Sequence, residues 1–177
     1  GNCLIDSWVR KNSKYKFDEG GILASTGKRN DIIFEQAQEL FANRPNQNTL
    51  SFDVNDFDVS FARGLSLEDG AATLTDLTAQ IIGTTLFSLL SKGGNKLCKV
   101  LVCGGGRKNK ILIEKIKKNT LKNIIIQPID EYGINGDFVE SQAFAFLAIR
   151  SILKLPISFP NTTGCLKPCT GGELIKN

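Results

Sequence analysis

The segment Lys99-Val-Leu-Val-Cys-Gly-Gly-Gly-Arg-Lys-Asn109 is an apolar run that stops at three consecutive glycines and gives way to a helical pattern. This order predicts a strand, a glycine turn and a helix. Because Gly104, Gly105 and Gly106 carry no Cβ, a flat ligand or a phosphate could approach the backbone, and N–H groups at a helix start favour negative charge. The turn is therefore a candidate nucleotide site. Its spacing fits neither the P-loop nor the dinucleotide fingerprint, so glycines that serve turn geometry alone are the alternative.

The flanking sequence extends this segment into a β-α-β unit. After a helix of about 109–118, a second apolar strand is expected at 123–127, and its direction should be parallel to the first. Upstream, Ser66 and an acidic turn precede one apolar face, which predicts a long helix over about 67–90. Shorter helices are expected at 2–10 and 31–42. Residues 44–62 are predicted to be a long irregular loop with at most a short helical turn, and the sequence beyond Pro156 an irregular closing segment.

The composition fits one medium-sized globular domain, because 41% of the 177 residues are apolar, enough for a core. No apolar run reaches the roughly 18 residues that span a bilayer, and no signal peptide opens the sequence, so we expect a soluble cytoplasmic protein without a membrane partner. The five cysteines lack C-x-x-C spacing and no histidine is present, which argues for reduced, mostly packing residues rather than a zinc site. Without histidine, proton transfer would need a carboxylate or another side chain.

The positive charge is concentrated in one stretch. Residues 107–122 hold seven basic side chains against Glu114, a local charge of +6 in a chain of net charge +4. No aromatic residue interleaves the lysines and no nucleic-acid-binding motif is present, so we interpret the stretch as a solvated helix face and expect no nucleic-acid partner.

A second polar segment, Gly133-Ile-Asn-Gly-Asp137, leads into an apolar helical pattern that runs to about Leu153. Asp137 is expected to cap this helix, and Glu140 lies in its first turn. A carboxylate there stabilises the helix dipole, and the alternative is a carboxylate held at the edge of a cleft.

Four colinear segments carry a resemblance to a known family. They are Gly1-Asn-Cys-Leu-Ile-Asp-Ser-Trp-Val9, Ala71-Ala-Thr-Leu-Thr-Asp-Leu-Thr-Ala79, Val102-Cys-Gly-Gly-Gly-Arg-Lys-Asn109 and Gly133-Ile-Asn-Gly-Asp-Phe-Val-Glu-Ser-Gln-Ala-Phe-Ala145. The chain thereby resembles anhydro-N-acetylmuramic acid kinase, a family of the actin-like sugar kinase and Hsp70 superfamily. The resemblance implies an enzyme that uses ATP and Mg²⁺ to open 1,6-anhydro-N-acetylmuramic acid with water and to phosphorylate its 6-oxygen, in peptidoglycan recycling.

The resemblance covers only the C-terminal half of the family. The phosphate loop, the aspartate that activates water and three strands of the second lobe all lie upstream in the family. Residues 1–177 are therefore expected to form a single partial domain, the C-terminal part of an actin-like (ribonuclease H-like) ATPase lobe with an incomplete parallel sheet. A two-stranded sheet with open edges should pair with something, either a separately encoded N-terminal half or another copy. Alone, the chain should not turn over, and a non-catalytic nucleotide-binding or interaction remnant of a split or decayed kinase gene is the alternative.

The resemblance also implies site residues. Gly104, Gly105, Gly106 and Asn109 would form the adenosine side of the ATP cleft. Glu140 would be the substrate-side carboxylate, with Asp137 second to it. No catalytic base and no metal ligand is assigned within this chain. Leu50 and Val54 stand where many members of the family have basic residues, which would weaken ligand contacts if those positions contribute to them.

Overall fold

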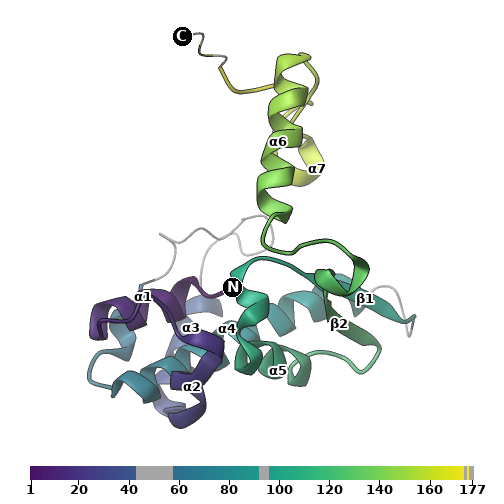
Figure 1. Cartoon of the computed structure of the whole chain (residues 1–177). Helices are drawn as coiled ribbons and strands as arrows, with labels where there is room; N and C mark the ends of the chain where they lie inside the picture. The colour runs from purple at the N-terminus through teal and green to yellow at the C-terminus, as the bar shows by residue number, and fades with distance from the viewer. Residues whose placement is uncertain (43–57, 92–95, 174, 176–177) are drawn as a thin grey trace.

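The computed structural model describes residues 1–42, 58–91, 96–173 and 175. Most of these residues are helical, and a small parallel sheet lies in the second half of the chain (Figure 1). In chain order the elements are α1 (Cys3–Asn12), η1 (Glu19–Gly21), α2 (Ile22–Thr26), α3 (Asp31–Ala42), η3 (Ser60–Ala62), α4 (Leu67–Leu90), β1 (Cys98–Val102), η5 (Gly105–Lys108), α5 (Lys110–Lys118), β2 (Ile124–Pro128), η6 (Ile129–Tyr132), α6 (Val139–Ile152) and α7 (Pro160–Thr163). The expected α/β class with a small sheet is confirmed.

Helix α4 is the centre of the core. It begins where the sequence predicts, because the Ser66 side chain accepts a hydrogen bond of 3.0 Å from the backbone N–H of Asp69. Helices α1, α2, α3 and α5 all pack against it. Leu74 and Leu77 are fully buried there, and ten residues of α4 are buried in all. The long helix predicted over about 67–90 is thus confirmed as the scaffold that carries the other elements.

The indole of Trp8 fastens α1 to the start of α4. Its Nε1 donates a 2.9 Å hydrogen bond to the carbonyl oxygen of Leu67, and its ring lies against Gly70, where a Cβ would overlap it. Glycine costs helix stability compared with alanine. At position 70 the close approach of the ring explains that choice.

The sheet confirms the predicted β-α-β unit. Strands β1 and β2 are parallel, with register Cys98↔Ile124 through Val102↔Pro128, and α5 connects them. Ile124 and Ile126 on β2 and Leu112 and Ile116 on α5 are buried in the same core as α4. Among the described residues the sheet has two strands, so neither outer edge is paired with a third.

The C-terminal region stands away from this core. Figure 1 shows α6 extending from the body beyond the sheet, and none of its residues is buried. The predicted cap was wrong: Phe138 holds the N-cap position without a side-chain hydrogen bond, because the Asp137 carboxylate pairs with two basic residues instead. The expected irregular tail contains α7 and an antiparallel bridge between Ser158 and Cys169.

The structure also bears on the predictions for the cysteines and for the loop at 44–62. The cysteines are free thiols, as predicted, but Cys103 and Cys169 are exposed and do not serve as packing residues. Most of the predicted loop at 44–62, together with Leu50 and Val54, lies outside the described residues. Its last part forms η3.

Candidate functional site

The glycine turn takes a backbone shape that requires glycine at its first position. Gly104 has φ 73° and ψ −176°, a region that side chains exclude. Gly105 has an open surface, since a Cβ built there or at Gly104 would meet no atom within 4 Å. The backbone N–H of Gly104 donates a 2.9 Å hydrogen bond to the carbonyl oxygen of Gly136. The structure therefore joins the two segments that sequence analysis treated separately, the glycine turn and the loop before α6.

Arg107 holds these two segments together. Its guanidinium donates to both carboxylate oxygens of Asp130, at 2.7 and 3.0 Å, to Asp137 Oδ1 at 2.7 Å and to the Gly104 carbonyl oxygen at 2.8 Å. Its side chain is only 8% exposed. Gly136 lies against the guanidinium. An ideal Cβ built on Gly136 would lie 2.5 Å from Arg107 Nε, so a larger residue at this position would displace the arginine.

The two carboxylates around Arg107 are strongly acidic. Hydrogen bonds from Arg107 lower the pKa of Asp130 and of Asp137 to about 2, and Lys108 contributes to the second through a 2.7 Å ion pair. The same bonds raise the pKa of Arg107. Asp137, expected as a substrate residue, is therefore an ionised tether at neutral pH, with both oxygens engaged by basic groups.

Asn109 lies beneath the turn rather than on its surface. Its side chain is the N-cap of α5, where Oδ1 accepts a 3.0 Å hydrogen bond from the backbone N–H of Leu112. The residue is 2% exposed, and its Nδ2 has no partner among the described residues. Any role of Asn109 in nucleotide binding would therefore be indirect, by holding the glycine turn in position.

Two residues of α1 and its N-cap that sequence reasoning did not single out also have buried polar atoms. Within the described parts of the chain, Asn2 Oδ1 and Asp6 Oδ1 are also buried without a hydrogen-bond partner. Burial raises the pKa of Asp6. An ideal Cβ on Gly106 would lie 3.9 Å from the Cα of Gly1, so the start of α1 adjoins the turn. Buried polar atoms normally find partners, which makes this a place where water or a polar ligand group would be stabilised.

Glu140 lies in the first turn of α6, as predicted, and is exposed. Its carboxylate has no hydrogen bond or ion pair within the part of the chain that the structure describes. The structure therefore does not bring Glu140 into contact with the glycine turn. It connects the two through Asp137, which is tethered to the turn and lies three residues before Glu140.

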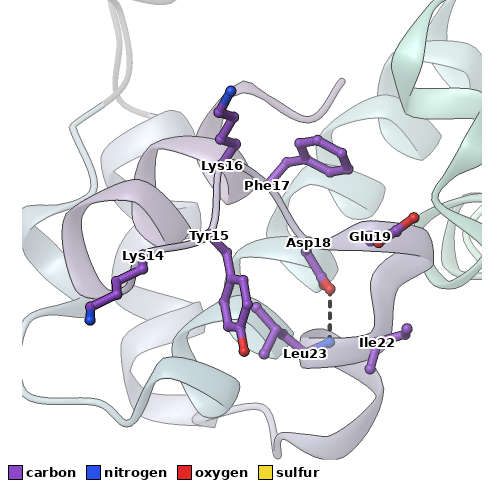
Figure 2. A pocket seen from close by; sticks show the side chains of 8 residues that line it. All are labelled: Lys14, Tyr15, Lys16, Phe17, Asp18, Glu19, Ile22 and Leu23. Carbon is purple, nitrogen blue, oxygen red and sulfur yellow. Dashed lines mark hydrogen bonds between the residues drawn. The ribbon is translucent and has the colours of Figure 1, made fainter.

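A pocket of about 490 Å³ lies at the segment between α1 and α2 (Figure 2). Its walls include Tyr15, Phe17 and Ile22, which are more than half exposed, with Lys14 and Lys16 beside them. The Asp18 carboxylate is not free to bind a ligand, because it accepts hydrogen bonds from the backbone N–H groups of the first residues of α2, at 2.7 and 3.0 Å. No sequence signal marked this pocket, which is built by a turn rather than by a motif.

The basic stretch at 107–122, predicted to be a solvated helix face, is only partly exposed to solvent. Lys110, Lys117 and Lys118 are exposed, as expected. Lys115, however, forms a 2.7 Å ion pair with Asp76 on α4 and so holds α5 to the core. Within the described ranges, no group of three metal-ligating acidic or sulfur side chains is found, and no helix there is long and apolar enough to cross a membrane.

Comparisons with known proteins agree with the resemblance. The family model for anhydro-N-acetylmuramic acid kinase matches residues 1–177. Similar curated proteins carry that name: one from Pelagibacter ubique is 52% identical over 177 residues, all of this chain and 47% of the relative. One from Zymomonas mobilis is 38% identical over 98% of this chain and 46% of the relative, and one from Caulobacter vibrioides 34% identical over 99% and 45%. The chain spans about half the length of the curated relatives it matches.

Proposed function

The chain belongs to the anhydro-N-acetylmuramic acid kinase family, and we propose that it forms the C-terminal lobe of an ATP-dependent kinase acting on 1,6-anhydro-N-acetylmuramic acid. The reaction opens the anhydro ring with water and transfers a phosphoryl group to the 6-oxygen, which gives N-acetylmuramic acid 6-phosphate for peptidoglycan recycling in the cytoplasm. The names of the relatives support the substrate. The chain spans about half the length of its curated relatives, and the enzyme also needs the remainder of the family sequence.

The proposed nucleotide role rests on the hydrogen bonds that join the glycine turn to the loop before α6. The glycine turn is open on its surface at Gly105, and Arg107 fixes it to the segment that leads to Glu140. A nucleoside can lie on a backbone that has no Cβ, and the rigid tether keeps that surface in place before the ligand arrives. We assign Gly104, Gly105 and Gly106 to adenosine contact and Asn109 to holding the helix behind them.

The carboxylates of this site do not fit a metal centre of their own. Asp130 and Asp137 are engaged by Arg107 and Lys108, and the described residues provide no cluster of three metal-ligating groups. Mg²⁺ would therefore enter with the phosphates of ATP, which supply part of its coordination. The chain's own contribution is to bind and orient the nucleoside.

Phosphoryl transfer depends chiefly on positioning and on neutralising charge, and both need groups from two closing lobes. This chain brings Glu140 to the exposed start of α6, where it could accept hydrogen bonds from sugar hydroxyls. The base that activates water is placed by the resemblance in the other half. We therefore propose that Glu140 orients the sugar, and that the chain alone is inactive.

Calorimetric titration with ATP tests the nucleotide role, first on the chain and then on its complex with the complementary half. Arg107→Met should weaken ATP binding at least tenfold, because the turn loses its tether. Lys110→Met is the matched control: it removes a neighbouring positive charge that is exposed. Equal losses in the two variants would show that ATP responds only to the basic patch. Absence of binding heat in both the chain and the complex would refute the nucleotide role itself.

A further inference from the structure

Two of the five cysteines come together in the segment after α7. Cys165 and Cys169 are the ends of the sequence Cys165-Leu-Lys-Pro-Cys169, and the Cys165 thiol lies within hydrogen-bonding range of the Cys169 thiol. Both are free thiols. A thiol is only a weak hydrogen-bond donor and acceptor, so the contact adds little stability and leaves both sulfurs available for covalent chemistry.

The backbone holds the two cysteines from opposite ends. Just before Cys165, α7 ends at Gly164, whose N–H donates a 3.1 Å hydrogen bond to the carbonyl oxygen of Pro160. At the other end, the antiparallel bridge to Ser158 includes a 3.1 Å hydrogen bond from the Cys169 N–H to the Ser158 carbonyl oxygen. The chain bends between the two anchored ends. The approach of the thiols therefore depends on the fold of this segment.

We propose that Cys165 and Cys169 form a modification site, a dithiol that a low-molecular-weight disulfide oxidises reversibly to an intramolecular disulfide. Cys169 is exposed and Cys165 is half-buried, so Cys169 meets the small disulfide first. The Cys169 thiolate attacks one sulfur of the small disulfide, which gives a mixed disulfide and releases one small thiolate. The Cys165 thiolate then attacks the Cys169 sulfur, forms the Sγ–Sγ bond and releases the second small thiolate.

The exchange balances without any further reactant. Two electrons pass from the cysteine pair to the small disulfide, which becomes two thiols, and the protons lost by the cysteines go to the released thiolates. Desolvation and the neighbouring Cys165 thiol raise the pKa of Cys169, so little of this residue is thiolate at neutral pH. The pair therefore reacts slowly, and its oxidation state at equilibrium follows the ratio of small disulfide to small thiol.

Oxidation would act on the segment that closes the C-terminal region. Two residues beyond Cys169, the Gly171 carbonyl oxygen accepts a hydrogen bond from the Ser151 hydroxyl on α6. The disulfide closes a covalent loop over 165–169 and so restricts the backbone that leads to this contact. Reduction returns the freedom of that backbone. The modification therefore controls how firmly the tail is held to α6.

Mapping the sulfurs in redox buffers tests the site. The reduced 177-residue chain is incubated in millimolar glutathione of increasing disulfide-to-thiol ratio, free thiols are capped with N-ethylmaleimide, and the products are identified by tandem mass spectrometry. We expect a disulfide between Cys165 and Cys169, at least tenfold more abundant than glutathione bound at Cys169, because the second exchange is intramolecular. Excess dithiothreitol should reverse it.

Two variants and a matched control assign the sulfurs. Cys165→Ser should remove the disulfide and leave Cys169 as a glutathione adduct. Cys169→Ser, at an exposed position that should not affect folding, should remove it from the other side. Cys103→Ser is the control, because Cys103 is also exposed, and it should form the disulfide as the parent does. A disulfide that joins other cysteines, or glutathione adducts at both sites without a disulfide, would overturn the proposal.

A comparison in urea separates the fold from closeness in sequence. At a fixed glutathione ratio, the amount of protein disulfide relative to free dithiol should fall at least fivefold in denaturing urea, because the unfolded chain no longer holds the two thiols together. An unchanged ratio would show that the fold does not bring Cys165 and Cys169 together, and would also overturn the proposal.

Discussion

Replacing Gly105 with valine tests whether the glycine turn carries the nucleotide. The substitution is compatible with the fold: a Cβ at this position would meet no atom within 4 Å, and Gly105 is not among the glycines with positive φ. In contrast, Gly104 has φ 73°, so any side chain there would strain the turn as well as crowd a ligand. Gly105→Val therefore changes the space in front of the turn without changing the turn.

The size of the effect follows from the van der Waals attraction that valine would prevent. A nucleoside lying on the turn would make on the order of ten close atom pairs, each contributing about 0.1–0.2 kcal/mol, and the valine methyl groups would occupy that layer. A loss of about 1.4 kcal/mol corresponds to tenfold weaker ATP binding. Gly105→Ala should give a smaller loss. Calorimetry measures the affinity for ATP, and a thermal melt confirms that the variant is folded. If folded Gly105→Val binds ATP as tightly as its parent, the glycine turn is not the nucleotide site.

Three further predictions address stability, pH and the sugar site. Gly70→Ala should destabilise the chain by about 1–3 kcal/mol in urea unfolding, because the new methyl group overlaps a tryptophan ring, and unchanged stability would contradict the packing described. The pKa of Asp137 is about 2, below its ordinary 3.8, so its link to Arg107 should break only as the pH falls through about 2. The stability that the link adds should be complete above about pH 4 and decline below it. Carboxyl-carbon NMR of Asp137 should give a titration midpoint near pH 2. A midpoint near pH 3.8 would show that the ion pair with Arg107 does not form in solution. In the two-half complex, Glu140→Ala should lower turnover more than Glu114→Ala on α5, and equal turnover would remove Glu140 from the site.

Local patterns were sufficient to predict most of the fold. The Ser66 cap and the apolar face behind it determine α4, and two apolar runs around one helix determine the parallel pair, because these signals act between residues close in sequence. Gly104 was identifiable for the same reason, since a strand that ends at glycines needs a turn of this kind.

The long-range hydrogen bonds that build the site could not be predicted in the same way. Arg107 meets Asp130 and Asp137 across 23 and 30 residues, and no periodicity links those positions. Local capping preference therefore predicted the wrong partner for Asp137, because two basic side chains compete successfully with the helix start. The burial of the Oδ1 atoms of Asn2 and Asp6 depends on how α1 packs, which only the assembled structure reveals.

The measurement that tests the kinase-lobe assignment most directly is ADP release with ATP, Mg²⁺ and 1,6-anhydro-N-acetylmuramic acid. The 177-residue chain alone should give none above background, because loss of a positioned base typically costs about 10²–10⁴ in rate and phosphate positioning is absent as well. Its complex with the complementary half should release ADP in step with phosphorylated sugar. Robust turnover by the chain alone, or none from a complex that binds ATP, would contradict the assignment.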